Sequence, residues 1–305
     1  MSTSARSLSV LMPTYQRVHL LPRVLEAWRA CLRDLPGAEL VVVDDGSSDG
    51  TPEVLTAAAV SFGEQGIGYR VVRQDNQGLA AARNAAIEAS RGDIVLFSDD
   101  DMVPSSNALA VLHLQRQAES PGAWVSRLVV PDEVVDTHFQ RYWRRRLHGG
   151  TEPLTEGQDL GKGGFWFATL SIPRELLGED RFSRAFTKYG WEEHELGYRL
   201  WQRGVRPKFL RSAVIEHHDQ MTIGEMERKF EQFGASAWMF ASLHPSTEVR
   251  VWTGTHPLSR FGRRFLLHEV RARQIRKRDP ETLSDRDWVV LLEAAYGRGL
   301  RAGKR

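Results

Sequence analysis

The sequence predicts an α/β fold built on a mainly parallel sheet. Short apolar runs alternate with stretches of helical spacing through the first hundred residues, a pattern typical of parallel strands joined by crossover helices. Three of the expected strands end abruptly in polar residues, and sheets of this kind bind ligands at the carboxyl ends of their strands. Of the 305 residues, 41% are hydrophobic and 26% are charged, which suits a globular protein with a substantial core.

The first third of the chain contains four expected strands, three of which are short and mainly apolar runs of strand length. They are Leu8–Met12, Glu39–Val43, Tyr69–Arg73 and Asp93–Ser98. Helical spacing covers Val18–Leu32 and the alanine-rich Gly78–Ser90. Between the second and third strands we expect Thr51 to cap another helix, with Pro52 at its first position.

The rest of the chain is less regular. We expect Pro131–Gly163, with its arginine and aromatic cluster over residues 138–146, to be a long loop with some helix. The cluster either clamps an anionic or lipid-linked ligand or packs its rings inward. Further strands are expected at Gly164–Ile172 and Val214–His218, and further helices at Glu192–Arg203, Thr222–Leu243, Leu258–Arg276 and Ser284–Arg298.

Charge and cysteine content narrow the class of protein. The formal net charge of +2 gives no reason to expect a nucleic-acid partner. Residues 248–305 carry 14 Lys and Arg against 7 Asp and Glu, which suits either a solvated helical face or peripheral contact with an anionic membrane. Cys31, the single cysteine, fits a reducing cytoplasm as a buried apolar residue. We expect neither a secretory signal nor a membrane-spanning helix.

The acidic triplet Asp99-Asp100-Asp101 is the first candidate site. It follows an expected buried strand directly. Mg²⁺ and Mn²⁺ prefer carboxylate oxygens, and such a cation can neutralise the charge of a departing diphosphate. Alternation along an extended segment predicts Asp99 and Asp101 on one side and Asp100 on the other. An isolated acidic triplet is usually a solvated turn, but the strand end favours a metal site here.

Polar residues also follow the second and third strands. Asp45, in the run Asp44–Gly50, can accept from a pyrimidine N3–H or a ribose hydroxyl, while Ser47, Ser48 and Asp49 suit a turn. Gly78, at the start of a helix, permits close approach of a ligand. Arg83, five residues further on, either reaches a diphosphate or stays a surface arginine.

Acidic residues begin the helix expected at Glu192. In Gly190-Trp191-Glu192-Glu193 the carboxylates complement the helix macrodipole, which is their ordinary purpose. The same dipole keeps a carboxylate ionised, as a general base requires. Trp191 can form a wall on which a sugar stacks.

The last expected strand ends in Glu216-His217-His218-Asp219. A neutral imidazole can complete a metal shell otherwise made of oxygens, and Mn²⁺ tolerates this better than Mg²⁺. Strand alternation sends His217 and His218 to opposite sides, so only one of them can face the site. Spacing alone does not decide which one.

Taken together in chain order, the motifs of this sequence resemble those of glycosyltransferase family 2, the large inverting family. The resemblance covers about residues 8–219 and rests on six motifs in series. They are Pro13-Thr14-Tyr15, Val43-Asp44-Asp45-Gly46-Ser47, Asn76-Gln77-Gly78 with Arg83-Asn84, Asp99-Asp100-Asp101, Ser171-Ile172-Pro173-Arg174, and Gly190-Trp191-Glu192-Glu193-His194-Glu195-Leu196.

The resemblance implies a GT-A fold, a Rossmann-like and mainly parallel sheet flanked by helices, here with a C-terminal helical extension. It implies roles for individual residues as well. The nucleotide would be contacted by Pro13, Tyr15, Asp45, Arg83, Asp99 and Asp100, and Mn²⁺ or Mg²⁺ would be bound by Asp101 with Asp99 and His217 or His218. Catalysis would fall to Glu193 with Glu192, and substrate contacts to Trp191, Glu192 and Gly164. The family usually has Glu-Asp where this chain has Glu192-Glu193, so the roles of these two stay open.

The implied function is metal-dependent, inverting transfer of a sugar from a nucleoside diphosphate sugar to an acceptor hydroxyl. The region around Trp191 resembles galactosyl- and N-acetylgalactosaminyltransferases, which favours a UDP-sugar donor. We divide the chain into a GT-A domain over residues 1–245, with a nucleotide-binding half over 1–104 and an acceptor-binding and catalytic half over 105–245, and a basic helical extension over 246–305. The acceptor, whether a glycan, a lipid-linked or a small molecule, stays open, as does a homodimer.

Two other functions are considered. A sugar-1-phosphate nucleotidyltransferase generally places a glycine-rich loop after its first strand, and residues 13–17 contain no glycine. A catalytically inactive nucleotide-sugar-binding scaffold is disfavoured because both acidic sets, at residues 99–101 and 192–193, are intact.

Overall fold

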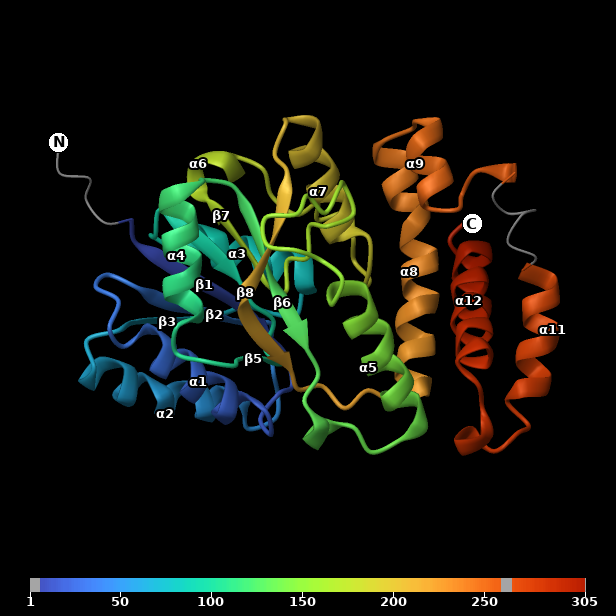
Figure 1. Cartoon of the computed structure of the whole chain (residues 1–305), viewed down its shortest axis with the longest axis horizontal. Coiled ribbons are helices and arrows are strands. Elements are labelled where there is room, and N and C mark those ends of the chain that lie inside the picture. Colours follow the sequence, from blue (N-terminus) through green and yellow to red (C-terminus); the bar gives the residue numbers. More distant parts are fainter. Residues whose placement is uncertain (1–5, 259–264, 305) are drawn as a thin grey trace. The chain divides into compact units, whose positions relative to one another are not determined.

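The computed structural model of the chain describes residues 6–258 and 265–304 (Figure 1). Its strands are β1 (Leu8–Thr14), β2 (Glu39–Asp44), β3 (Gly68–Arg73), β4 (Ile94–Phe97), β5 (Met102–Pro104), β6 (Ala123–Val129), β7 (Leu170–Pro173) and β8 (Pro207–His217). Its helices are α1 (Leu21–Leu32), α2 (Thr51–Glu64), α3 (Leu79–Ala89), α4 (Leu109–Glu119), α5 (His138–Thr151), α6 (Arg174–Leu177), α7 (Glu192–Gln202), α8 (Ile223–Leu243), α9 (Thr247–Trp252), α11 (Phe265–Ile275) and α12 (Asp285–Ala302). Short 3₁₀ turns lie at Asp132–Val134 and Pro280–Thr282.

The chain forms two compact units. Unit 1 contains the described residues through Pro131, together with Leu147–Phe182 and Leu196–Asp219. Unit 2 contains Asp132–Arg146, Ser183–Glu195 and the described residues from Gln220 onward. Helix α8, which the sequence analysis assigns to the first domain, therefore belongs to the same compact unit as α11 and α12. The functional division at residue 245 stays a prediction.

Unit 1 is built on an eight-stranded sheet with the order β3-β2-β1-β4-β7-β6-β8-β5. Strands β3, β2, β1 and β4 are parallel, as predicted, and β6 is parallel to β8. Strand β7 is antiparallel to both β4 and β6, and β5 is antiparallel to β8. Two reversals of direction separate β4 from β6, so β4 and β8 run the same way. Their carboxyl ends consequently lie at one edge of the sheet.

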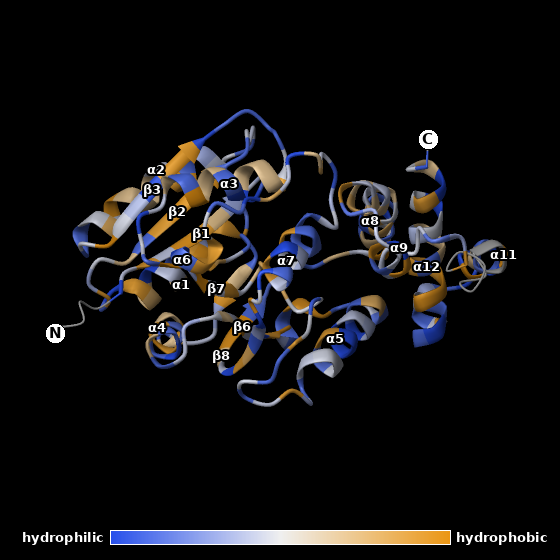
Figure 2. Ribbon diagram, turned by 90° about the horizontal axis from the view of Figure 1, so that it is seen from above, coloured by the Kyte–Doolittle hydropathy of each residue, from blue (hydrophilic) through white to orange (hydrophobic). Residues whose placement is uncertain are grey.

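Strand alternation divides the core of unit 1 between the two faces of its sheet. Val10 and Met12 of β1 pack with residues of α1, α2 and α4, whereas Leu11 packs with α3 and with the part of α7 that belongs to this unit. The central strands are the most hydrophobic part of the sheet (Figure 2). Burial on both faces explains why these strands are continuous apolar runs in the sequence.

Unit 2 is helical, and its core surrounds Trp288 of α12. Phe139 and Tyr142 of α5 pack against that indole, with ring centroids 5.2 and 6.4 Å away. Helices α8 and α12 approach closely at glycines: a Cβ on Gly234 would lie 2.1 Å from the Tyr296 carbonyl oxygen, and one on Gly299 would lie 1.9 Å from that of Glu231. Small residues at these positions therefore let the two backbones touch.

Several sequence expectations need correction. Only the last third of the strand expected over Gly164–Ile172 forms, as part of β7, because the chain turns and bends at residues 167–169. The long loop with some helix expected over Pro131–Gly163 is confirmed, and its helix is α5, which has 14 residues. Thr51 does not cap α2, since Gly50 is the N-cap residue and the Thr51 hydroxyl accepts from the Arg17 amide instead.

Other differences concern extent rather than type. Strand β8 begins at Pro207, seven residues before the expected strand, and α4, β5 and β6 were not anticipated. The helix expected over Leu258–Arg276 corresponds to α11, and its residues 259–264 lie outside the described part of the chain. Among the described residues, no helix has both the length and the apolar character needed to cross a membrane.

Candidate functional site

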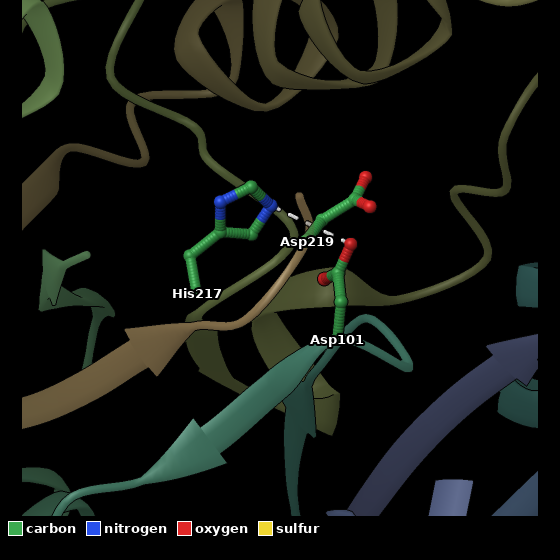
Figure 3. A group of neighbouring side chains, drawn as sticks. All are labelled: Asp101, His217 and Asp219. Carbon is green, nitrogen blue, oxygen red and sulfur yellow. Dashed lines mark ion pairs between the residues drawn. The ribbon is translucent and has the colours of Figure 1, made fainter. Parts of the chain in front are cut away.

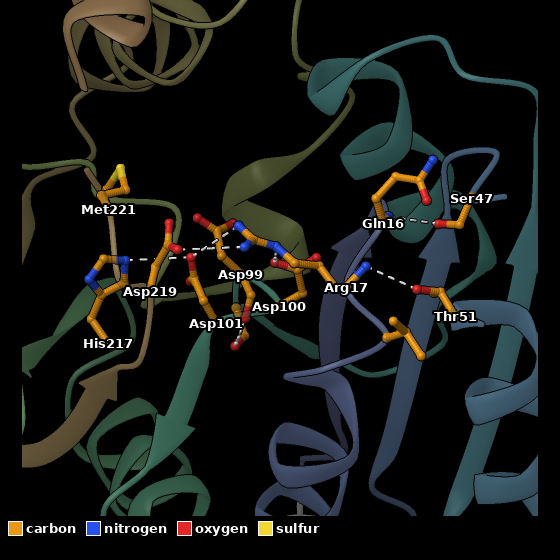
Figure 4. Close-up of polar contacts among 12 residues, drawn as sticks. Gln16, Arg17, Ser47, Thr51, Asp99, Asp100, Asp101, His217, Asp219 and Met221 are labelled. Carbon is orange, nitrogen blue, oxygen red and sulfur yellow. Dashed lines mark hydrogen bonds and ion pairs between the residues drawn. The ribbon is translucent and has the colours of Figure 1, made fainter. Parts of the chain in front are cut away.

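The acidic triplet lies in the connection between β4 and β5, at the edge of the sheet where β4 ends (Figure 4). Asp100 and Asp101 form a turn and share one cation: Arg17 Nε lies 3.2 Å from Asp100 Oδ1, and its Nη2 lies 3.6 Å from Asp101 Oδ2. Asp99 has a different partner, Arg83. The expected pairing of Asp99 with Asp101 on one side is therefore wrong, because the segment turns instead of extending.

A candidate metal group forms where this turn meets the end of β8. One ligand atom each from Asp101, His217 and Asp219 lies within 4.8 Å of the others (Figure 3). Within the group, His217 Nε2 lies 3.5 Å from Asp101 Oδ2. Two carboxylates and one imidazole are a donor set that Mn²⁺ accepts readily. The residues of unit 1 thus fit a divalent cation.

The two histidines at the end of β8 have different partners. His217 approaches Asp101, whereas His218 Nε2 lies 2.9 Å from Glu216 Oε2. The His218 backbone amide also donates to the Asp101 carbonyl oxygen, at 2.9 Å, which fixes the acidic turn against β8. The sequence did not decide which imidazole could bind a metal. The geometry brings His217 into the candidate metal group, whereas His218 contacts Glu216 and holds the acidic turn through its backbone amide.

Burial and charge set the protonation of the acidic turn. Burial raises the pKa of Asp100 to about 7; Arg17 opposes this shift, and Asp101 adds to it. Burial alone would lower the pKa of the Arg17 guanidinium, but Asp100, Asp101 and Asp219 raise it above its ordinary value. Arg17 is consequently a permanent cation among these acidic groups.

Arg17 is held in place by the loop that follows β2. The backbone amides of Gln16, Arg17 and Val18 donate to Ser47 Oγ, Thr51 Oγ1 and Asp49 Oδ2, at 2.9, 3.0 and 3.2 Å respectively. Gln16 has a positive φ of 56°, a conformation that is strained for a side chain of its size. These contacts fix the backbone from which the Arg17 side chain projects (Figure 4).

Asp45 ties the end of β2 to the start of α3. Its Oδ1 accepts from the Gln77 amide at 2.9 Å and the Gln74 side chain at 2.7 Å, and its Oδ2 accepts from the Gly78 amide at 2.8 Å. Gly78 has a φ of +86° and open space where a Cβ would lie. Asp45 therefore organises this turn, and its contact with a nucleotide stays a prediction.

The other predicted nucleotide ligands differ in accessibility. Pro13 is buried inside β1, whereas Tyr15, just beyond that strand, is 47% exposed. Arg83 is only 1% exposed, so it is not a surface arginine. Its Nη2 lies 2.8 Å from Asp99 Oδ1, and its guanidinium carbon lies 5.4 Å from the centroid of the Phe182 ring. Asp99, whose side chain is half-buried, thus pairs with a buried guanidinium and is not part of the candidate metal group.

The acidic pair at the start of α7 lies in unit 2. Trp191, which precedes it, has a positive φ of 71° and stacks on Phe233 with a centroid distance of 4.6 Å. Its indole is 5% exposed and one face is already covered, which restricts the predicted stacking of a sugar. Both Glu192 and Glu193 line a cavity of about 270 Å³ in this unit.

The walls of this cavity are mostly aromatic or sulfur-containing. Trp143, Tyr189, Phe230 and Phe233 contribute rings, and Lys229 contributes a cation. The cavity is therefore an apolar pocket with carboxylates on its wall, an arrangement common in small-molecule sites.

Two further sequence predictions concern the loop region. Gly164 lies buried in a turn, where an added Cβ would be 2.1 Å from Leu160 Cβ, so its role in substrate binding stays a prediction. In the cluster over residues 138–146, Phe139 and Tyr142 pack inward, and Arg141 and Arg145 pair with Glu281 and Asp285. The inward-packing alternative therefore holds for these two rings.

Sequence reasoning missed Arg17 and Asp219 as members of the site. Arg17 lies two residues after Pro13-Thr14-Tyr15, and Asp219 is the last residue of the recognised run Glu216–Asp219, although no role was given to it. A charged residue just beyond a strand end was the available signal.

Comparison with known families and structures identifies the family and the fold. The family described as Glycosyl transferase family 2 matches residues 9–172. Among curated proteins, the undecaprenyl-phosphate 4-deoxy-4-formamido-L-arabinose transferase of Pseudomonas aeruginosa (strain LESB58) is 34% identical over 136 residues. The match covers 40% of this chain and 40% of the relative, so the chain spans well under two thirds of the length of that relative.

Two solved structures share the fold at low sequence identity. The mannosyltransferase PcManGT from Pyrobaculum calidifontis, in complex with GDP-Man and Mn²⁺, has a TM-score of 0.60 and 18% identity, covering 97% of this chain and 88% of that one. S. aureus TarS 1–349, in complex with UDP, has a TM-score of 0.54 and 14% identity, covering 98% and 89%. The predicted GT-A fold with a helical C-terminal region is confirmed.

Proposed function

The chain belongs to glycosyl transferase family 2, and we propose that it moves a sugar from a nucleoside diphosphate sugar to an acceptor hydroxyl with inversion of the anomeric centre. The observation that carries the proposal is the group of Asp101, His217 and Asp219, at the edge of the sheet where β4 and β8 end. This is the edge at which α/β sheets bind ligands. We therefore propose that the nucleoside diphosphate sugar binds to unit 1.

Asp101, His217 and Asp219 would hold Mn²⁺ or Mg²⁺. When bound, such a cation supplies positive charge that stabilises a departing diphosphate. Mn²⁺ suits the mixed oxygen and nitrogen donors better than Mg²⁺, which prefers oxygen. Arg17, a permanent cation, lies beside two of the same carboxylates, Asp101 and Asp219, in this structure.

Glu193 is proposed as the general base. It stands in the first turn of α7, where the helix dipole favours the ionised carboxylate, and it lines the cavity of unit 2. In this role it accepts the proton of the acceptor hydroxyl as the oxygen attacks the anomeric carbon. Glu192, which is 3% exposed, would orient the acceptor, and Trp191 would supply one wall of the acceptor pocket.

The base of the donor nucleotide is the finer part of the proposal. A UDP-sugar is our hypothesis, from the resemblance around Trp191; of the two structural neighbours, one is in complex with GDP-Man and the other with UDP. Pro13, Tyr15 and Asp45 are the residues proposed to meet the base and ribose. The relative named as an undecaprenyl-phosphate transferase makes a lipid-linked acceptor one option beside glycans and small molecules.

A thermal-shift panel tests the donor site. UDP, GDP, dTDP and CDP are each added to the full chain with Mn²⁺, Mg²⁺ or EDTA. A ligand that binds only the folded state stabilises the protein by mass action and so raises its melting temperature. At a ligand concentration of 100 Kd the free energy of unfolding rises by about 2.7 kcal/mol. We expect one metal-dependent nucleotide, and we expect Asp101→Ala to abolish its shift. No shift with any diphosphate would refute the donor site.

Product analysis separates the alternatives. Release of pyrophosphate from a nucleoside triphosphate and a sugar phosphate would identify a nucleotidyltransferase. Binding of a nucleotide sugar with neither transfer nor slow hydrolysis would identify an inactive scaffold. Inverting transfer predicts a product of opposite anomeric configuration, which NMR reads directly.

The proposal includes peripheral contact of the basic C-terminal helices with an anionic membrane. In unit 2, Arg276 lies 2.5 Å from Glu227, and Arg298 lies 3.0 Å from Glu231, so some of the excess charge is already paired. Sedimentation with anionic vesicles at low salt tests the contact, and failure to pellet would remove it. A cytoplasmic location and a homodimer stay hypotheses; gel filtration with light scattering tests the dimer.

A further inference from the structure

Arg17 occupies the centre of the acidic edge of unit 1. Its three nitrogens each approach a different carboxylate: Nε lies 3.2 Å from Asp100 Oδ1, Nη2 lies 3.6 Å from Asp101 Oδ2, and Nη1 lies 3.6 Å from Asp219 Oδ1. The side chain is 24% exposed, so it is shielded without being sealed in. One guanidinium thus holds three carboxylates of the same turn and strand end together (Figure 4).

Two of these carboxylates, Asp101 and Asp219, are also members of the candidate metal group. Asp101 Oδ2 in particular is shared, because it lies 3.6 Å from Arg17 and 3.5 Å from His217 Nε2. A divalent cation bonded to this oxygen at about 2.1 Å would lie within roughly 6 Å of the guanidinium. The two positive charges would repel each other, so Arg17 and a metal ion compete for the same oxygens.

The backbone of Arg17 is held by hydrogen bonds, but its side chain can still rotate to a different partner. The amides of Gln16, Arg17 and Val18 are bonded to the loop over residues 47–51, so this backbone does not follow the side chain. A long arginine side chain on a fixed backbone can change partner by rotating its own bonds. Guanidinium groups match phosphate oxygens as well as they match carboxylates.

We propose that Arg17 is an internal counter-ion that takes the place of the divalent cation in the ligand-free chain and moves to the diphosphate when the donor binds. The proposal rests on the metal site and donor class given above. Its consequence is that nucleotide diphosphate and metal bind cooperatively. Metal alone must overcome Arg17, whereas a diphosphate gives Arg17 a new anionic partner and frees Asp101 and Asp219 for the metal.

The proposal predicts effects of opposite sign for one substitution. In Arg17→Gln the carboxylates lose their competitor, so Mn²⁺ binds more tightly in the absence of nucleotide. The same variant lacks the cation that would meet the diphosphate, so nucleotide binds more weakly when Mn²⁺ is saturating. A residue that only stabilised the loop would weaken both. The coupling between the two ligands is reciprocal, so either titration measures it.

The experiment measures Mn²⁺ binding to the full chain from the electron paramagnetic resonance signal of the free ion, with and without saturating UDP or GDP. Wild-type protein, Arg17→Gln and Arg17→Lys are compared with Arg116→Gln, which removes a guanidinium on α4 that is paired with Glu119 and Glu156. We expect Arg17→Gln to lower the Mn²⁺ Kd about three- to tenfold without nucleotide and to reduce the coupling. Arg116→Gln should match wild type.

Three outcomes overturn the proposal. In folded Arg17→Gln, a nucleotide-free Mn²⁺ Kd equal to or higher than that of wild type would show that Arg17 does not compete. If Arg17→Gln does not fold, Arg17→Lys replaces it, because a compact ammonium cannot reach three carboxylates at once; its Kd should lie below that of wild type, and an equal or higher value counts against the proposal. No Mn²⁺ binding by any variant, even with nucleotide, would remove the metal site as well.

Discussion

Gly190 offers a direct test of how the segment that carries Glu192 and Glu193 is held. Gly190 has a φ of +103°, and a Cβ built on it would lie 2.3 Å from Phe233 Cδ2 and 2.9 Å from Phe233 Cα. The second of these atoms belongs to the backbone of α8, so a rotation of the ring alone cannot make room. Gly190→Ala must therefore strain the backbone and separate the segment from α8.

The magnitude has two parts. A side chain at a positive φ costs about 1–2 kcal/mol, and insertion of a methyl group into a packed contact costs about 1–3 kcal/mol. Gly190→Ala should therefore lower the free energy of unfolding by about 2–5 kcal/mol. Gly204 is a matched control, because its φ is +89° and no atom lies within 4 Å of the position that an added methyl group would take. Gly204→Ala should therefore show the backbone cost alone, about 1–2 kcal/mol.

Urea unfolding followed by circular dichroism measures both variants, and donor turnover is measured on protein that is still folded. We expect turnover of Gly190→Ala to fall at least about tenfold below that of Gly204→Ala, since displacement of a catalytic group by about 1 Å can cost about 100-fold. If Gly190→Ala were no less stable than Gly204→Ala, the close approach to Phe233 would not be what holds this segment, and the reasoning would be refuted.

The remaining predictions concern the proposed general base, a buried histidine and a helix contact. Glu193→Gln should lower kcat by about 10²–10⁴-fold while keeping the metal-dependent nucleotide shift, and near-normal turnover of folded protein would exclude the base. Burial between Ser126 and Ser171 lowers the pKa of His113 to about 3, so its neutral form contributes stability that is fully present above about pH 6.5 and is lost as the pH falls toward 3. Between about pH 7.5 and pH 5.0 this group should remove about 2 kcal/mol from the free energy of unfolding, which urea titrations would measure, and an equally steep dependence in His113→Gln would contradict the assignment. Gly299→Ala should destabilise by about 1–3 kcal/mol through collision with the Glu231 carbonyl, and an equal effect of Gly224→Ala, where space is open, would argue against that collision.

The sequence predicts the parallel part of the fold well because local patterns encode it. Strands β1, β2 and β4 are short apolar runs with polar ends, and each of the strands β1 to β4 lies within about two residues of its expected bounds. Strands β5 and β6 were missed. Strand β5 has only three residues, directly after an acidic turn, and β6 is interrupted by Ser126 and Arg127, so neither shows an apolar run of ordinary strand length. Their pairing with β8 depends on contacts far away in the sequence.

Some residues of the candidate site could be identified from local sequence patterns, and others depend on contacts between distant segments. Asp101 and the histidine pair were identified because strand ends are visible in the sequence. The choice of His217 over His218, and the separation of Asp99 from Asp101, depend on how the acidic turn closes against β8. Arg17 reaches that turn only because three backbone amides near it are bound by a loop some thirty residues later. No local pattern records such a contact.

The composition of unit 2 has a consequence for the order in which the protein is made. The ribosome delivers Trp191 and the two glutamates after it roughly 90 residues before α12 begins at Asp285. At about 5–20 residues per second, that interval is on the order of 5–20 s. Through this time the segment has no α12 against which α8 can close, although most of unit 1 is already synthesised. Newly made chains should therefore form most of the sheet of unit 1 well before the segment proposed to carry the general base becomes ordered.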